Sequence, residues 1–454
     1  MAEGLITERE LRSAKRALER CISMGASDAR ISLSKSLMNA VGMLDGAVDK
    51  TAHALDRSLS FALFVDGKFG TFSTNRIDDE SLDGFIEDAV TTVRMLQEDA
   101  CRKLPERERI VKDAVSGREL DLYDPEYETM TAERRLSLAK DSVLPVSEGR
   151  NPAGIPYKVV SEEGEYSDSI FDLVILDSRG LEARHTETSF EIGYEITVED
   201  PEGNRFSGYW WDASPKLAGV LGSVRSCSSE AMERAAAQMG PVPGKSGKMT
   251  VVVDSEVASR LVRPLISALN GYSLQQNNSF LAGKKDVKVF GDNVTIMERP
   301  IVPGRTGSRL FDSEGVAASA FPIIENGTVR SAFINTYISG KMDVGPTVED
   351  SIRMAVMPVG GCRTRDDVLR KVGEGLLVTG FNGGNSNSST GAFSYGVEGF
   401  LIHDGKIASP VREILITGDF ITLWNNLVAA AEDVRPCMTK DIPTLAFAGV
   451  DVSA

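Results

Sequence analysis

The chain has 454 residues, which is enough for two or three domains that each bury a core. Hydrophobic residues make up 42% and charged residues 26% of the sequence, the balance of an ordinary globular protein. The formal net charge of -16, without any cluster of Lys and Arg, argues against direct nucleic-acid binding.

Helical and strand-like patterns follow one another in the N-terminal half. Residues 5–24 carry apolar positions at helical spacing, and Gly25 follows as a stop signal. Residues 28–75 alternate polar and apolar side chains, which predicts strands, and the pair Asp66-Gly67 predicts a hairpin turn. The remaining expectations for this half are a helix at about 79–97, a loop over 100–130, a helix at about 131–143, strands over 157–213, and a helix at about 217–239.

A domain boundary is predicted near residue 240. The stretch GPVPGKSGK, residues 240–248, places two prolines and three glycines between a predicted helix and the strand-like MTVVVD. We therefore expect a mixed helix and antiparallel-sheet domain over 1–240 and a strand-rich domain over 241–454. The second is expected to contain a helix at about 255–269, a polar loop at 270–285, and short strands with a hairpin turn at Asp404-Gly405. Because helices and strands occur in blocks, the fold class is predicted as α+β.

Targeting and redox signals predict a cytoplasmic protein. No run of about 18 apolar residues occurs, so no membrane span is expected. The first 21 residues are charged and amphipathic, unlike a signal peptide. The five cysteines are far apart and form no CxxC pair, which suggests neither a zinc knuckle nor a dithiol site and fits a reducing compartment.

Local motifs nominate no catalytic centre. GPVPGKSGK resembles the end of a phosphate loop, but its first glycine is one residue too close and it leads into a strand, whereas such a loop must open a helix. His53, His185 and His403 are too far apart in sequence to form a local metal-binding pair. No GxSxG motif is present, so a serine hydrolase is not indicated.

The glycine-rich stretch GFNGGNSNSSTGAFSYGVEGF, residues 380–400, allows three interpretations. It is a phosphate-holding loop, a flexible linker, or the lining of a site. Glycines permit close approach of backbones, and Phe393 and Tyr395, near Gly391, are candidates to contact an extended substrate or a partner. The alternative is structural, with glycines at tight corners and Ser and Asn bonding to local backbone.

The C-terminal half resembles the TldD/PmbA family, once called modulators of DNA gyrase. The resemblance rests on three blocks in order: DSEVASRLVRPLISALNGYSLQQNNSFLAGKKDVKVF, GSRLFDSEGVAASAFPIIENGTV, and NSSTGAFSYGVEGFLIHDGKIASPVREILITGDF. The N-terminal half fits more loosely. The most specific signals are FDSEGV and STGAFSYGVEGF, which combine uncommon glycine placement with aromatics in fixed order.

One branch of this family, TldD, carries HExxxH on a helix, with two histidines as zinc ligands and a glutamate that activates water. The matching helix here is LVRPLISALNG, where Arg263 and Pro264 stand near the first ligand position and Ser267 and Ala268 about one turn later. The zinc ligands and the general base are therefore absent. The chain thus resembles the other branch, PmbA or TldE.

That resemblance implies a non-catalytic subunit that pairs with a TldD-type subunit to form a zinc peptidase acting on small or unfolded peptides. Zinc is then expected only in the partner, no cofactor is expected in this chain, and a homodimer is the alternative assembly. Two other functions stay open. The first is an independently active metal-dependent hydrolase with dispersed ligands such as His403, Asp312 or Glu314. The second is a regulatory module that binds another protein.

The motif FDSEGV offers one more candidate. Asp312 and Glu314 lie two residues apart and would share a strand face as a paired-carboxylate site. The alternative is a turn, helped by Gly315, in which both carboxylates bond to neighbouring backbone amides. All three residues are candidates for lining a substrate site or an interface.

Overall fold

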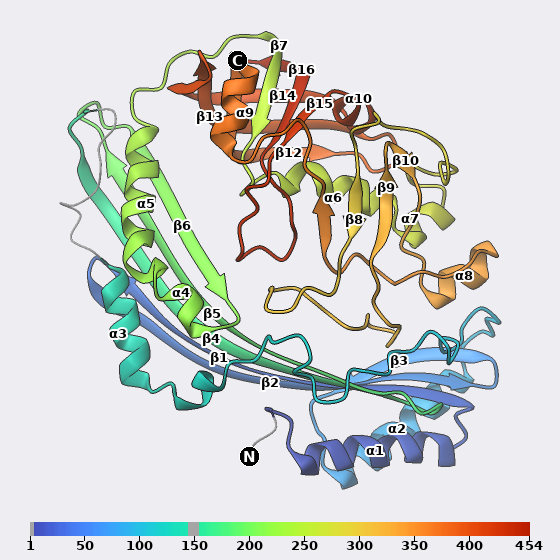
Figure 1. Cartoon of the computed structure of the whole chain (residues 1–454). Coiled ribbons are helices and arrows are strands. Elements are labelled where there is room, and N and C mark those ends of the chain that lie inside the picture. The colour runs from blue at the N-terminus through green and yellow to red at the C-terminus, as the bar shows by residue number, and fades with distance from the viewer. Residues whose placement is uncertain (1–3, 144–153) are drawn as a thin grey trace.

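Four strands of 17 to 20 residues form the centre of the N-terminal half. The computed structural model, which describes residues 4–143 and 154–454, joins them with two shorter strands in an antiparallel sheet of order β3-β2-β1-β4-β5-β6 (Figure 1). The bounds are β1 Asp28–Leu44, β2 Ala47–Val65, β3 Lys68–Thr74, β4 Lys158–Asp177, β5 Glu182–Glu199 and β6 Arg205–Ser214. We call this the N-terminal sheet.

Helices cover one face of the N-terminal sheet. Side chains alternate between the faces of a strand, and in β4 the even-numbered residues, such as Tyr166, Ile170 and Val174, are buried against the helices. The helices are α1 Glu8–Ser23, α2 Asp79–Arg94, α3 Ala132–Ser142, α4 Leu217–Val220 and α5 Ser223–Ala237, with a 3₁₀ turn at Pro125–Thr129. The odd-numbered residues of β4 therefore point to the opposite face, which faces the C-terminal half (Figure 1).

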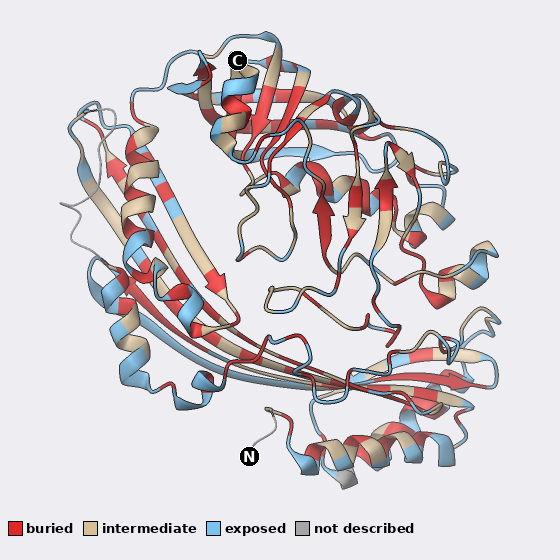
Figure 2. Ribbon diagram, in the orientation of Figure 1, coloured by how far each residue is buried: buried red, intermediate tan, exposed pale blue. Residues whose placement is uncertain are grey.

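The C-terminal half is built around a closed barrel. Its sheet has the order β14-β13-β12-β7-β16-β15, and β14 also pairs with β16, which closes the ring. The strands are β7 Gly247–Val253, β12 Gly375–Ser386, β13 Ala392–His403, β14 Lys406–Asp419, β15 Leu427–Ala430 and β16 Leu445–Ser453. Closure removes most unpaired edges from this sheet, and Figure 2 shows buried residues concentrated along its strands.

Helices and a smaller sheet pack around the barrel. The helices are α6 Ser259–Ala268, α7 Gly271–Gln275, α8 Thr336–Met342, α9 Arg365–Val372 and α10 Phe420–Asn425. The small sheet has the order β10-β9-β8-β11, with β8 Ile296–Glu298, β9 Phe321–Glu325, β10 Thr328–Val329 and β11 Met354–Val356. Val251 and Val253 face the core shared with α6, and Val252 between them faces α9.

The predicted fold class is confirmed, with helices and antiparallel strands in separate blocks. The first helix begins after Thr7, whose side chain forms a capping box with Glu10. The predicted turns at Asp66-Gly67 and Asp404-Gly405 are present, and all four residues have positive φ, as tight hairpin turns require. The domain boundary at 240/241 stays a prediction.

Two expectations were wrong in detail. The single helix expected at 217–239 is two helices, α4 and α5, because the helical hydrogen bonding is interrupted near Gly222, a residue with poor helix propensity. The loop expected at 270–285 contains the short helix α7, which Asn270 caps by accepting the backbone N–H of Tyr272 at 3.0 Å. Among the described residues, no helix is both long and apolar enough to cross a membrane.

The central strand β13 allows a test of its backbone packing. A Cβ added to Gly399 would lie 1.9 Å from the carbonyl oxygen of Leu377 in β12, and backbone cannot move aside cheaply. We expect Gly399→Ala to lower the free energy of unfolding by about 2 kcal/mol or more. Gly383→Ala is the matched control, because a Cβ there meets nothing within 4 Å, and its effect should stay within about 0.5 kcal/mol. Urea denaturation measures both, and equal effects would contradict this prediction.

Candidate functional site

Helix α6 separates an apolar face from a polar one. Leu261, Val262 and Leu265 are buried in the barrel core, and the indole N–H of Trp424 donates to the Leu261 carbonyl at 3.3 Å. On the other face, residues three and four apart lie above one another. Ser259, Arg263 and Ser267 are such residues, and all three line a cavity. We call it the α6 pocket.

The α6 pocket has a volume of about 610 Å³, within the usual range for small-ligand sites. Its other walls come from distant segments, namely residues 255–256, 350–354 and 438–442. Hydroxyl and amide side chains dominate the lining: Ser255, Ser259, Ser267, Asn270, Ser273, Ser351 and Thr439. Apolar contact is supplied by Ile266, Met354, Met438 and Ile442.

Four charged side chains line the α6 pocket: Glu256, Arg263, Asp350 and Lys440. Burial lowers the pKa of Lys440, and the nearby charge of Arg263 lowers it further, whereas Glu298 and Asp350 raise it. Glu256 is already neutralised from outside the pocket, because Arg234 of α5 binds its two oxygens at 2.8 and 2.9 Å. The free charge in the pocket is therefore mainly positive.

The α6 pocket does not fit zinc. Arg263 and Ser267 occupy positions one turn apart on its wall, and neither side chain is a usual zinc ligand. Pro264 is half-buried within α6, where it removes a helical hydrogen bond, and Ala268 is buried in the core, so neither lines the pocket. The positive charges of Arg263 and Lys440 would repel a divalent cation.

Elsewhere in the described part of the chain, one group of three side chains is close enough to share an ion: Glu374, His403 and Asp404. All three are exposed, Glu374 contacts Nδ1 of His403 at 2.7 Å, and Asp404 lies 3.5 Å from Nε2. The two carboxylates thus face different ring nitrogens, which is the arrangement of a surface ion pair. Asp312 and Glu314 do not belong to this group, so the structure does not bring the proposed dispersed ligands together.

FDSEGV forms a buried turn. The Asp312 carboxylate accepts the backbone N–H groups of Glu314, Val316 and Glu349, each at 2.9 Å. Glu314 accepts the backbone N–H and the hydroxyl of Thr336, both at 2.9 Å. Asp312 therefore holds the backbone of its own turn, as the turn interpretation predicts, whereas Glu314 reaches Thr336 at the start of α8 instead of a neighbouring amide. A role in lining a substrate site stays a prediction.

Gly315 gives the same turn its shape and its contact with the N-terminal sheet. Its φ is +78°, and an added Cβ would lie 2.3 Å from the Leu181 side chain. Arg30 of β1 donates to the Glu314 carbonyl at 3.1 Å. The turn therefore packs against the N-terminal sheet.

The glycine-rich stretch is a β-hairpin, formed by β12 and β13 around a turn at residues 387–391. The linker interpretation is therefore wrong. Phe393 and Tyr395 are 5% and 1% exposed and stack with ring centroids 5.5 Å apart in the barrel core. Gly391 has φ +78° and packs against Phe280. A role of these residues in an interface or in lining a substrate site stays a prediction. The contacts that they make in the structure are packing contacts within the C-terminal half.

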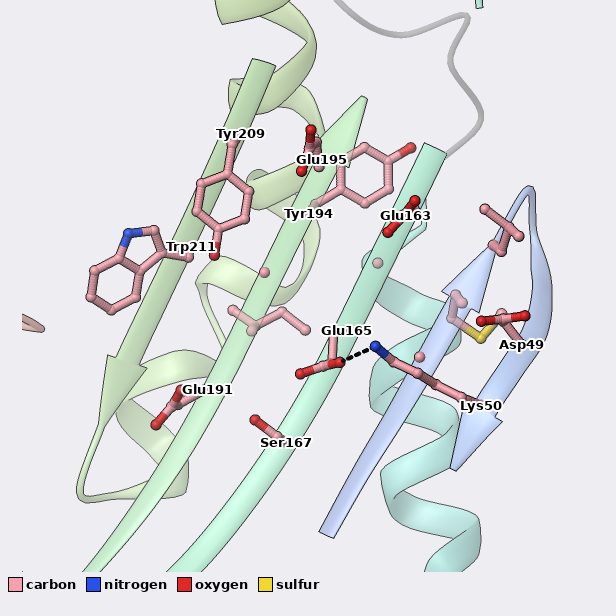
Figure 3. Close-up of a pocket in the computed structure, with 16 residues that line it drawn as sticks. Asp49, Lys50, Glu163, Glu165, Ser167, Glu191, Tyr194, Glu195, Tyr209 and Trp211 are labelled. Atoms are coloured by element: carbon pink, nitrogen blue, oxygen red, sulfur yellow. Dashed lines mark ion pairs between the residues drawn. The ribbon is translucent and has the colours of Figure 1, made fainter. Parts of the chain in front are cut away.

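A second hollow, of about 300 Å³, lies on the N-terminal sheet face opposite the helices (Figure 3). Its lining is acidic, with one lysine: Asp49, Lys50, Glu163, Glu165, Glu191 and Glu195. Lys50 pairs with Glu165 at 3.1 Å, and this contact raises the pKa of Lys50. Tyr209 and Trp211 of β6 add aromatic surface. The hollow can attract cationic groups, although solvated carboxylates on an open sheet face are common.

Sequence patterns do not reveal most of either hollow. The sequence singles out Arg263 and Ser267 only because they stand near the positions that the HExxxH histidines occupy in TldD-type chains. Asp350 and Lys440 lie in loops without any motif and reach α6 through the fold. The alternation of β4 is visible in the sequence, but the pairing that brings Glu191 of β5 beside β4 and Tyr209 of β6 beside β5 is not.

Comparisons with known proteins identify the family. Residues 246–454 match the PmbA/TldA metallopeptidase C-terminal domain, and residues 29–92 match the PmbA/TldA metallopeptidase domain 1. A crystal structure from Bacteroides thetaiotaomicron, described as a modulator of DNA gyrase, is 35% identical with a TM-score of 0.92. It covers 99% of this chain and 100% of its own. The chain belongs to the PmbA/TldD metallopeptidase family.

Other relatives place the chain on the PmbA side of the PmbA/TldD family. The Metalloprotease PmbA homolog of Haemophilus influenzae is 25% identical over 437 residues, covering 94% of this chain and 92% of that protein. TldE from Thermococcus kodakarensis has a TM-score of 0.80 at 18% identity, covering 97% of this chain and 100% of its own, and thus shares the fold. The resemblance to the TldD/PmbA family, which rested most specifically on FDSEGV and STGAFSYGVEGF, is confirmed.

The turn at Asp312 predicts a pH dependence of stability. Burial raises the pKa of Glu349 above its usual 4.5, and the carboxylates of Glu314 and Asp312 raise it further. The folded chain then binds this proton more tightly than the unfolded chain, so stability falls as pH rises from about 4.5 through the raised pKa. We expect Glu349→Gln to weaken this fall and to be more stable than the original chain at pH 7.

Urea denaturation at pH 4, 5.5 and 7 measures the effect. The hydroxyl of Ser313 donates to Glu349, and a glutamine oxygen can still accept this bond. Glu202→Gln, at an exposed turn between β5 and β6, is the control. A Glu349→Gln variant that keeps the full fall in stability between pH 4 and 7 would contradict the prediction.

Proposed function

We propose that this chain is a non-catalytic subunit of PmbA/TldE type, which works with a TldD-type zinc peptidase subunit on small or unfolded peptides. One observation carries the proposal. The polar face of α6 presents Arg263 and Ser267 to the pocket, at the positions where the resemblance to the family implies zinc ligands in a TldD-type subunit.

The chemistry of the α6 pocket supports this assignment. Peptide hydrolysis by a zinc enzyme needs neutral or anionic side chains that bind the zinc ion, and a base that activates the zinc-bound water. Glu256, just before α6, is held by Arg234 and by Arg435, whose nitrogen lies 3.8 Å away. Asp350, the other lining carboxylate, has no histidine beside it among the residues that line the pocket. The pocket therefore suits binding rather than hydrolysis.

The edge of the N-terminal sheet supports assembly with another chain. β3 pairs with β2 only from Leu59 to Val65, so residues 47–57 form an exposed edge (Figure 2). Leu55 and Val48 on this edge are 57% and 44% exposed. Long edges with apolar side chains favour pairing with a further strand. A TldD-type subunit of the same family is the proposed occupant of this edge.

Metal content and activity test the catalytic part of the proposal. After dialysis, we expect less than about a tenth of an equivalent of zinc in the purified chain, since cationic pockets repel Zn²⁺. The chain alone should cleave no unfolded peptide. Mixed with a TldD-type subunit, it should give cleavage that a chelator abolishes and added zinc restores. Elemental analysis and a fluorogenic peptide assay provide the measurements.

A TldD-type subunit with both HExxxH histidines replaced by alanine is the control for this experiment, and its mixture should be inactive. Close to one equivalent of zinc in the isolated chain, together with chelator-sensitive cleavage, would refute the non-catalytic assignment. It would support the independently active hydrolase instead.

Assembly is tested on the edge itself. Leu55→Glu places a charge on the exposed edge of β2 and should weaken association with the TldD-type subunit by on the order of tenfold. Val287→Glu is the matched control, because Val287 is an exposed apolar residue in a loop outside β2, at 42% exposure. Size-exclusion chromatography with light scattering measures the mass and the amount of the complex formed by the two subunits. Undiminished association of Leu55→Glu would show that the partner binds elsewhere.

A further inference from the structure

We propose that the α6 pocket binds a peptide through its carboxylate group, with Arg263 and Lys440 as the recognising side chains. The inference rests on the proposed function only in taking a peptide as the ligand. It assigns to this chain a binding role of its own at the place where the zinc ligands are missing.

Charge is the first reason to expect an anion in the α6 pocket. In the part of the chain that the structure describes, neither Arg263 nor Lys440 has an ion pair within 4.0 Å. Yet both line one cavity and are close enough for the charge of Arg263 to disfavour the charged form of Lys440. Two cations that share a partly desolvated cavity repel one another, and an anion between them would remove that repulsion.

Carboxylates near the α6 pocket make their direct contacts with groups other than Arg263 and Lys440, and those of Glu298 are all with neutral donors. Glu256 is held by Arg234 at 2.8 Å. Buried Glu298 accepts the hydroxyl of Ser351 at 2.7 Å and two backbone N–H groups at 2.7 and 2.8 Å. Asp441, next to Lys440 in sequence, binds Arg305 and Arg353 at 3.0 and 2.5 Å.

Asp350 is the remaining lining carboxylate. It is exposed at the pocket, and it accepts the backbone N–H of Ser351 at 2.8 Å. One exposed carboxylate cannot satisfy both cations. Asp350 and the deeper Glu298 act on Lys440 with opposite charge, whereas Arg263 has no ion pair with a carboxylate among the described residues.

The shape and polarity of the α6 pocket favour an organic anion. A guanidinium binds a carboxylate in a planar, two-point geometry, and a lysine adds a point charge. Hydroxyls of Ser259, Ser267 and Thr439 line the same cavity and can complete the hydrogen bonds of a carboxylate and its adjoining amide. Ile266 and Ile442 offer apolar contact for a neighbouring side chain. Inorganic phosphate would leave that apolar surface unused.

Calorimetry on the isolated full chain tests the proposal. The probes are the tripeptide Ac-Ala-Ala-Leu with a free carboxylate and the same tripeptide as its amide. We expect the acid to bind on the order of tenfold more tightly than the amide, as loss of a charge-assisted pair implies. Arg263→Gln and Lys440→Gln should each remove most of this difference. Lys245→Gln is the matched control on an exposed loop and should bind as the original chain does.

Two further measurements test for unfolding of the variants and for general anion binding. Thermal unfolding of each variant establishes that it is folded, which is expected because Arg263 is exposed and Lys440 half-buried. Competition with acetate and with phosphate distinguishes a carboxylate site from a general anion site. Acetate should displace the acid peptide at least as well as phosphate.

Equal binding of acid and amide would overturn the proposal, and so would unchanged binding by both folded variants. Stronger displacement by phosphate would overturn the carboxylate assignment. The result is separable from the proposed function, because the isolated chain is measured without a partner subunit. Cleavage by the mixed subunits with no carboxylate preference refutes only this inference. Zinc in the isolated chain with a clear carboxylate preference refutes only the non-catalytic assignment.

Discussion

At one junction between the two halves of the molecule stands a half-buried carboxylate, Glu256, in the turn between β7 and α6. Both terminal nitrogens of Arg234 from α5 bind it, and the guanidiniums of Arg234 and Arg435 lie 4.1 and 3.9 Å from the ring centroid of Trp210. Burial raises the pKa of Glu256, which the two arginines offset only in part. Such a group is tolerated only while its partners remain in place. Because the same turn leads into α6, the shape of the α6 pocket depends on this junction.

The long strands of the N-terminal sheet explain why the molecule has room for polar hollows. Helices occupy one face only, so half of the side chains on β4 and β5 project to the other side. Loops from the C-terminal half cover part of that face, where Arg309 pairs with Glu187 at 2.9 Å and lies over the ring of Phe171. Beyond this contact the face stays hydrated and acidic, which is compatible with glutamates that have no apolar covering.

Local patterns were sufficient for most of the fold. Alternation predicted the long strands, Asp-Gly pairs predicted two hairpin turns, and Gly25 marked the end of the first helix, which runs from Glu8 to Ser23. The C-terminal motifs carried the resemblance to the family, and the structure shows why one of their glycines is required: a Cβ at Gly399, in STGAFSYGVEGF, would lie 1.9 Å from the carbonyl oxygen of Leu377. The site was less predictable. Its residues come from segments far apart in the sequence, and no local pattern reports that Lys440 faces the same cavity as Arg263.

The proposed absence of zinc chemistry and the proposed anion site rest on the same residues. An amphipathic helix against a barrel fixes where its polar face points, and the residues at one-turn spacing then decide which ligand is attracted. Histidines in such positions would offer nitrogen lone pairs to a metal cation, whereas Arg263 adds a positive charge that repels one. Lys440 strengthens this repulsion from a loop on another wall of the pocket. Neither cation has an ion pair in the described part of the chain, and the proposed counterpart of Arg263 and Lys440 is a negatively charged group on whatever enters the pocket.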